Sequence, residues 1–216
     1  MGDNTLERVN EIKYLGVILD NKINWKGQIK LIQTKVSRGC YIISKLKHYV
    51  GIDTLKMIYF STIYPHLSYC VTSWGGTAKS TLLPLVRLQK RALRIMTNSP
   101  FNSPSAPIFS KLKILPLDQI YKLNLSTLFH KIFNNKISTP SHLLPISKTH
   151  TYNTRLSNNK NYYQNFNRLN IGKRTYSSQG IKVWRKIPTE FKSLPSHLFK
   201  LKMKNYLLNS PQITNL

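Results

Sequence analysis

Acidic residues are what this 216-residue sequence has least of. Seven Asp and Glu residues stand against 33 Lys and Arg residues, so the formal net charge at pH 7 is +26. Polymerisation of nucleotides requires paired carboxylates that hold two metal ions, and no two acidic residues are spaced as such a pair or form a Tyr-x-Asp-Asp doublet. We therefore expect no catalytic residue, no metal ligand, and no autonomous polymerase or nuclease activity.

Other signatures of enzymes and cofactor sites are also missing. Cys40 and Cys70 are the only cysteines, and neither has a Cys or His partner at ligand spacing, which argues against a disulfide scaffold or a zinc site. The six histidines are scattered, with no pair at i, i+4. Neither G-x-S-x-G nor G-x-x-x-x-G-K-[ST] occurs. We expect no cofactor and no small-molecule substrate.

Long hydrophobic runs are absent as well. The longest, such as residues 82–86, are far shorter than a bilayer requires, and no apolar segment near the N-terminus resembles a signal peptide. We expect an intracellular protein without a membrane partner. Nothing in the sequence separates the nucleus from the cytoplasm.

The excess of positive charge is spread along the whole chain. A protein this basic is expected to bind a polyanion, and nucleic acid ranks ahead of an anionic membrane surface. A coding bias toward Lys and Asn is an alternative source of part of the excess. The oligomeric state is not encoded in any pattern that we find.

The hydrophobic periodicity predicts a mainly α fold with a short N-terminal β-hairpin, a three-helix bundle and a second helical region. From residue 25 to 46 apolar residues recur at spacings of three and four, which predicts a helix with one buried stripe and a basic opposite face. A helix over about residues 119–134 has apolar residues nearly all round and is predicted to be mostly buried. We predict one buried strand over residues 12–19, paired with the segment just before it, with Gly16 marking a bulge and Asp20 a turn. We predict three divisions: residues 1–24 for the hairpin, 25–98 for the bundle, and 105–208 for the second region, which includes a polar loop at 147–175.

Four cations share one face of the helix predicted over residues 80–97. Arg87, Lys90, Arg91 and Arg94 recur at i, i+3, i+4 and i+7. Such a face can follow a phosphate backbone without reading bases. A solvated face of an ordinary amphipathic helix is the alternative. At two positions of the buried face of this helix the spacing leaves a choice: either Leu88 or Gln89 is buried, and either Ile95 or Met96.

Two further arginines, Arg155 and Arg174, lie in polar segments that contain tyrosines. Arginine and tyrosine together suit stacking and phosphate contact with single-stranded nucleic acid. A disordered Asn-rich loop over residues 147–170 is the alternative. The tryptophans Trp25, Trp74 and Trp184 occur in apolar patterns and are predicted to be core anchors.

Several strings together resemble one family. They are Lys13-Tyr14-Leu15-Gly16-Val17 with Leu19-Asp20 and Trp25, the segment 58–69 with Trp74-Gly75 after it, Leu88-Gln89-Lys90-Arg91-Ala92-Leu93-Arg94, Asn153-Thr154-Arg155, and Gly172-Lys173-Arg174-Thr175-Tyr176. Over residues 10–208 the chain resembles the region that follows the catalytic palm in reverse transcriptases of non-LTR (LINE-like, jockey-type) retrotransposons.

The resemblance implies a function. Residues 25–98 would be a thumb, Tyr14, Leu15 and Gly16 would form a primer grip, and residues 1–24 would be a remnant of the palm edge. The catalytic aspartates would lie upstream of Met1, and Mg²⁺ would be bound only in that missing palm. The partners would be RNA and an RNA–DNA hybrid, held while the palm performs RNA-directed DNA synthesis. The alternative is a free-standing basic helical protein that binds RNA or protein.

Overall fold

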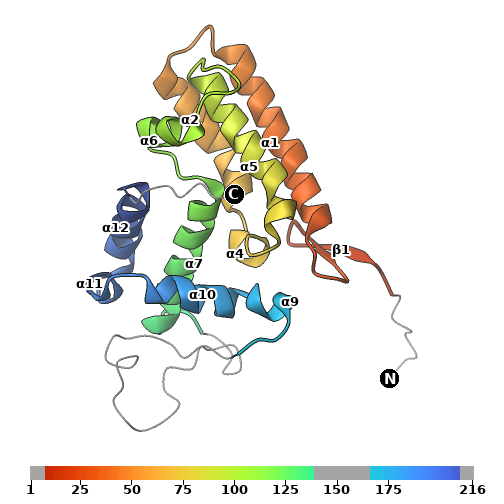
Figure 1. Ribbon diagram of the computed structural model, residues 1–216, viewed down its shortest axis with the longest axis vertical. Helices are drawn as coiled ribbons and strands as arrows, with labels where there is room; N and C mark the ends of the chain where they lie inside the picture. The colour runs from red at the N-terminus through yellow and green to blue at the C-terminus, as the bar shows by residue number, and fades with distance from the viewer. Residues whose placement is uncertain (1–7, 139–165, 210–216) are drawn as a thin grey trace.

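The computed structural model describes residues 8–138 and 166–209 (Figure 1). It is mainly helical with a two-stranded N-terminal hairpin, which confirms the predicted fold class. The elements are β1 (Glu11–Tyr14), β2 (Val17–Asp20), α1 (Lys26–Leu46), α2 (Ile52–Thr62), α3 (Tyr64–Ser68), α4 (Val71–Trp74), α5 (Lys79–Met96), α6 (Ser105–Leu112), α7 (Leu117–Phe133), α9 (Asn170–Lys173), α10 (Tyr176–Arg185), α11 (Thr189–Lys192) and α12 (Ser196–Asn209). Arg155 and most of the predicted polar loop lie outside the described residues.

The N-terminal hairpin differs from the predicted buried strand. Strands β1 and β2 pair antiparallel, with Tyr14 opposite Val17. The two loop residues between them have positive φ angles, 45° at Leu15 and 79° at Gly16, and this backbone twist suits a two-residue hairpin turn. The prediction of one strand was wrong because Gly16 closes a turn instead of a bulge. The apolar residues on its two sides therefore pair with each other, and Val17 is the only buried residue of the hairpin.

Helices α1 and α5 lie side by side and run parallel (Figure 1). At their N-terminal ends the Thr77 hydroxyl donates a 3.3 Å hydrogen bond to the Asn24 carbonyl, and at their C-terminal ends the Lys47 ammonium donates one of 3.0 Å to the Asn98 side chain. The apolar stripe predicted for α1 is buried at every central position. Its buried residues are Ile29, Ile32, Val36, Cys40 and Ile43.

The structure decides both alternatives on the inner face of α5. Gln89 and Met96 are buried, while Leu88 and Ile95 are only partly covered. Hydrogen bonding explains how a buried position accepts a glutamine, because a buried amide without partners would be costly.

Gln89 connects α5 to α2 and to the start of α7. Its amide nitrogen donates to the Tyr59 hydroxyl and to the Leu115 carbonyl, and its oxygen accepts from the Leu117 N–H, each at 2.9 Å. Burial is the main reason that the pKa of the Tyr59 hydroxyl is raised above its ordinary value. The same apolar core continues from α1 to α12.

Helix α7 forms the centre of the second helical region, with α10 and α12 packed on it (Figure 1). As predicted, its apolar side chains are buried nearly all round, among them Leu117, Ile120, Leu123, Leu125, Phe129 and Ile132. Helix α10 approaches closely at Gly180, where an added Cβ atom would lie 1.9 Å from the Phe129 ring. Glycine is therefore required at this crossing for steric reasons.

Two titratable groups lie within the apolar packing of this second region. The His130 ring stacks on Phe199 at 4.1 Å between centroids, and its Nε2 lies 2.8 Å from the Leu194 carbonyl oxygen. Burial lowers the pKa of His130. The Lys192 ammonium lies 5.4 Å from the centroid of the Trp184 ring, and burial lowers its pKa to about 8. Trp184 and Trp74 are fully buried, as predicted for core anchors, whereas Trp25 is only partly buried and packs against the same core.

Candidate nucleic-acid interface

The four cations singled out on α5 are not equivalent in the structure. Arg87 and Arg91 are exposed and Lys90 is half-buried on the outer face of the helix. Within the described residues, no hydrogen bond or ion pair to these three side chains is found. Arg94 instead holds the loop that follows α5, because its guanidinium donates two hydrogen bonds, of 3.0 and 2.9 Å, to the Ser103 carbonyl.

Helix α1 adds a second row of cations next to α5. Lys30 and Arg38 are exposed and lie two turns apart, so they share one side of the helix. Tyr41, which is 63% exposed, lines the same shallow depression as these two cations. The sequence showed α1 as basic on its outer face, but it did not single out Tyr41, because one tyrosine at a polar position carries no signal of its own.

Arg91 lies near the border between the two helices. Its positive charge acts on the thiol of Cys40 in α1, although burial is the larger effect and raises the Cys40 pKa to about 11. We call the outer faces of α1 and α5, two helices that pack against each other, the two-helix basic face. Its described members are Lys30, Arg38, Tyr41, Arg87, Lys90 and Arg91.

Very little acidic charge compensates these cations. In residues 8–138 and 166–209 the one salt bridge joins Lys122 to Asp118, at 3.1 Å within α7. A polyanion that approaches the two-helix basic face meets cations that are exposed and not paired with carboxylates, which is the arrangement that favours binding of phosphates.

The predicted primer-grip residues form the tip of the hairpin. Tyr14 and Leu15 are 63% and 73% exposed. The Leu15 carbonyl accepts a 2.6 Å hydrogen bond from the hydroxyl of Tyr69, just after α3. The ring of Tyr69 is also the nearest contact that a Cβ atom at Gly16 would meet, at 3.8 Å. The tip is thus tied to the helices and presents its apolar side chains outward.

The exit from the hairpin into α1 is organised by Asp20. Its carboxylate accepts hydrogen bonds from the backbone N–H groups of Lys22, Asn24 and Trp25, at 3.1, 3.0 and 2.8 Å. Partial burial raises the pKa of this carboxyl, but the three backbone donors outweigh burial and hold it below its ordinary value. The turn role predicted for Asp20 is confirmed.

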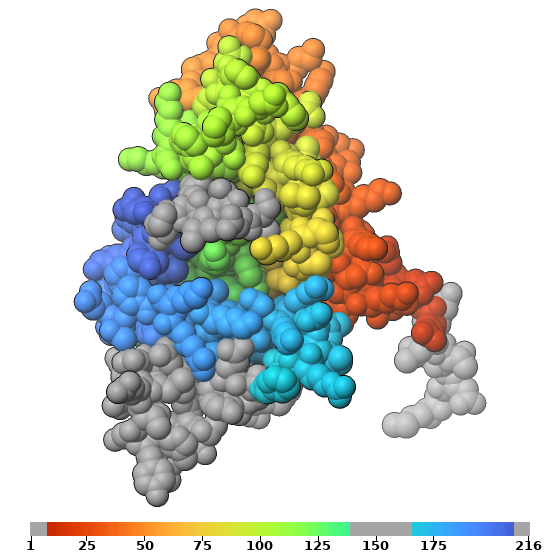
Figure 2. Space-filling view, viewed as in Figure 1, coloured from red at the N-terminus to blue at the C-terminus, as the bar shows by residue number. Residues whose placement is uncertain are grey.

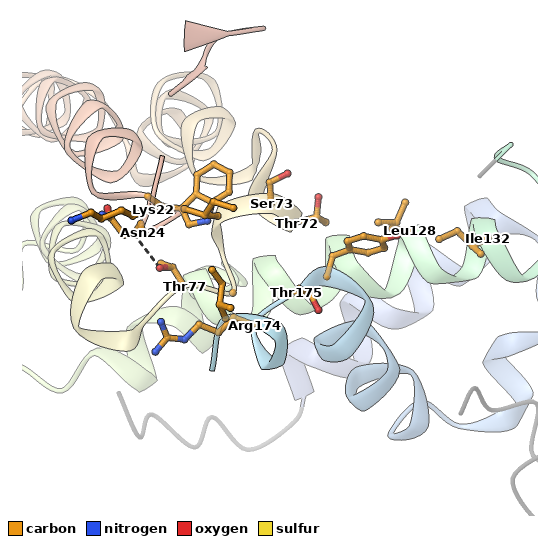
Figure 3. Close-up of a pocket in the computed structure, with 14 residues that line it drawn as sticks. Lys22, Asn24, Thr72, Ser73, Thr77, Leu128, Ile132, Arg174 and Thr175 are labelled. Atoms are coloured by element: carbon orange, nitrogen blue, oxygen red, sulfur yellow. Dashed lines mark hydrogen bonds between the residues drawn. The ribbon is translucent and has the colours of Figure 1, made fainter. Parts of the chain in front are cut away.

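Arg174 is not part of the two-helix basic face and instead lines a cavity of about 650 Å³ between the hairpin exit, α4, α7 and α10 (Figure 3). Lys22, Trp25 and Thr77 line the cavity with it. Arg155 falls outside the described residues, so its place relative to Arg174 stays a prediction. No sequence pattern indicates this cavity, because its walls come from four separate parts of the chain.

In residues 8–138 and 166–209, no three His, Cys, Asp or Glu side chains gather as metal ligands would. Among the helices of these same ranges, none combines the length and apolar character that crossing a membrane requires.

Comparison with known proteins shows a distant, partial similarity to reverse transcriptases of non-LTR retrotransposons. The chain is 26% identical over 113 residues to the RNA-directed DNA polymerase from mobile element jockey of Drosophila funebris, and 32% identical over 106 residues to that of Drosophila melanogaster. It is 26% identical over 103 residues to a probable RNA-directed DNA polymerase from transposon BS of Drosophila melanogaster.

These matches cover 50%, 47% and 44% of this chain and 12%, 12% and 11% of the three relatives, so the similarity spans about an eighth of their length. No family model matches the chain, and no solved structure matches it. The chain is related to these reverse transcriptases over about half of its own length.

Proposed function

We propose that this chain binds nucleic acid as the thumb and C-terminal region of a non-LTR retrotransposon reverse transcriptase. In this role the two-helix basic face holds the RNA template–DNA primer duplex through its phosphates. The proposal is carried by the exposed, uncompensated cations of α5, in a chain related to RNA-directed DNA polymerases.

The geometry suits backbone contact more than base recognition. Arg87 and Arg91 are one helical turn apart, and Lys30 and Arg38 are two turns apart on the parallel neighbour α1. Cations in two such rows can neutralise phosphates along a strand, which fixes the position of a duplex independently of its sequence. Each neutralised phosphate releases counterions and makes the affinity fall with salt.

The hairpin tip completes this proposal as the primer grip. Tyr14 and Leu15 are exposed, and the Tyr69 hydroxyl ties the tip to the end of α3. The tip is therefore a fixed apolar projection against which a primer end can rest. As the resemblance implies, the paired carboxylates and Mg²⁺ would belong to a palm, and this chain would supply binding, not chemistry.

The affinity for a labelled RNA–DNA hybrid, measured by fluorescence anisotropy against salt concentration, tests the proposal. We expect the slope of log affinity against log salt to become shallower by about 2 in a double variant, Arg87→Ala with Arg91→Ala, since two phosphate contacts are lost. A matched control, Lys200→Ala with Lys204→Ala, removes the same charge from two exposed lysines one turn apart on α12.

The control double variant should keep the slope of the wild type. Equal losses in both variants would mean that the net charge of +26 attracts nucleic acid without a defined face. No binding of the hybrid at low salt would remove the proposed function and favour the alternative, a free-standing protein that binds other partners.

A further inference from the structure

The cavity beside Arg174 has one charged end and one apolar end. In Figure 3 the charged groups of Lys22 and Arg174 lie at the end where Thr77 donates its hydrogen bond to the Asn24 carbonyl, whereas Leu128 lies on α7 toward the other end. At about 650 Å³ the cavity is within the size range of small-ligand sites. No acidic residue is among the described residues that line it.

Aromatic surface and hydroxyl groups complete the lining. Trp25, just before α1, and Tyr176, at the start of α10, contribute aromatic rings. The hydroxyl groups come from Thr72, Ser73 and Thr175. Aromatic rings near cations are the combination that binds unpaired nucleotides, because every base has a face that can stack and every nucleotide carries a phosphate.

One wall of the cavity is held in an uncommon backbone conformation. Ile23 and Trp25 have φ angles of 50° and 63°, which are rare for residues with a Cβ atom and are costly for a β-branched one. The Asp20 carboxylate accepts the Trp25 N–H at 2.8 Å and so holds this conformation. The Trp25 ring is thereby placed at the cavity before any ligand arrives.

We propose that this cavity binds one unpaired nucleotide of a nucleic-acid strand. The base lies against Trp25 and Tyr176, and its phosphate lies at Lys22 and Arg174. The cavity lies at the N-terminal end of the two-helix basic face and shares no residue with it. Lys30 follows Trp25 by five residues and Arg87 follows Thr77 by ten, which at 1.5 Å per residue of helix is about 8 and 15 Å along α1 and α5. The inference extends the proposed function, since it rests on nucleic acid being the ligand, from a duplex to a single strand beside it.

Tryptophan fluorescence offers a direct test. Trp74 and Trp184 are fully buried and Trp25 is only partly covered, so a base that enters the cavity quenches Trp25 selectively. The probes are an oligothymidylate of twelve nucleotides and an abasic strand with the same number of phosphates. We expect oligothymidylate to quench the emission and to bind about tenfold more tightly than the abasic strand, and Trp25→Phe to abolish the quenching.

Two variants that each add a phenyl ring test whether oligothymidylate binds in the cavity. Ser73 is exposed at the cavity, and Ser73→Phe should fill the space and weaken oligothymidylate binding about tenfold. Ser61→Phe adds the same ring at an exposed position of α2 and should leave the affinity unchanged. Far-UV circular dichroism verifies that both variants are folded. Should Ser73→Phe be unfolded, Arg174→Ala replaces it, with the same expected loss.

The outcomes separate this inference from the proposed function. Equal affinity for the abasic strand, or quenching that persists in Trp25→Phe, would overturn the nucleotide site whatever the duplex does. Binding of the RNA–DNA hybrid without any quenching by oligothymidylate would leave the two-helix basic face standing and remove only the cavity. Quenching by oligothymidylate in a protein that does not bind the hybrid would retain the cavity and remove the duplex role.

Discussion

The first helical region, α1 to α5, and the second, α7 to α12, differ in whether their polar side chains lie outside or inside the packing. In α1 and α5 the apolar residues recur at helical spacing and the cations lie outside. In the second region α7 is covered nearly all round, and polar or titratable groups such as His130, Lys192 and Ser178 are buried with it. Gln89 lies where the two regions meet.

Because of this difference, the two regions should tolerate substitutions and changes of pH to different degrees. A stripe of aliphatic side chains gains stability from the area that it buries, and it can adjust to small changes in shape. A buried imidazole or ammonium, and a glycine pressed against an aromatic ring, depend on particular neighbours. We therefore expect the second region to be the more sensitive to an added methyl group and to protonation.

The largest effect is expected where the two regions are joined. Replacing Gln89 by Met leaves the Tyr59 hydroxyl, the Leu115 carbonyl and the Leu117 N–H without their partner, and we expect a loss of about 4 kcal/mol in the free energy of unfolding, measured with urea. Gln33→Met, on the outer part of α1, is the control and should change stability by less than about 0.5 kcal/mol. Two separate unfolding transitions in the wild type would show that the regions are independent.

Replacing one glycine by alanine in each region compares how the two regions tolerate an added methyl group. A Cβ atom at Gly180 would lie 1.9 Å from the Phe129 ring, whereas one at Gly39 in α1 would lie 2.5 Å from Cγ1 of the buried Ile63. Both positions are inside helices, so the gain in helix propensity is shared. We expect Gly180→Ala to cost about 3 kcal/mol and Gly39→Ala about 1 kcal/mol or less in thermal or urea unfolding. Equal costs would contradict the proposed difference in tolerance.

A polar group in the hairpin exit, just before the first region, is expected to matter less. Asp20→Ala removes the acceptor for three backbone N–H groups and should cost about 1 to 2 kcal/mol, as for the loss of a helix cap. Because the folded pKa of Asp20 is lowered, its contribution is present above the ordinary carboxyl pKa and is lost as the pH falls below it. Asp53→Ala, an exposed residue in the first turn of α2, is the control and should be nearly neutral.

The smallest effect is a dependence of stability on pH near neutrality. Burial lowers the pKa of His130, so below pH 6.5 the unfolded chain takes up protons first, and the folded state loses stability as the pH falls. Burial and Lys35 also lower the pKa of His66 in the first region. His130→Gln should flatten the curve of unfolding free energy between pH 7 and 5 more than His66→Gln. The reverse order would place the pH-sensitive packing in the first region.

The predictions from sequence succeeded where the helical spacing of apolar residues decides which side of a helix is buried. The buried stripe of α1 and the all-round burial of α7 follow from spacing alone, since helical period decides which residues share a face. The single buried strand predicted over residues 12–19 was wrong for a local reason: an apolar run around Gly16 fits a buried strand and an exposed turn equally well. The roles of Arg87, Lys90, Arg91, Arg94, Arg155 and Arg174, and those of Tyr14, Leu15 and Gly16, stay predictions for the binding experiments.

The sequence by itself determined the helical class, the apolar faces of the long helices and the excess of positive charge, because these depend on composition and on neighbours within one or two turns. Only the tertiary structure decided that Gln89 and not Leu88 is buried, that Arg94 is engaged by the Ser103 carbonyl, and that Trp25 and Arg174 line one cavity. Each of these depends on residues brought together from separate segments, and helical spacing carries no information about which segments will meet.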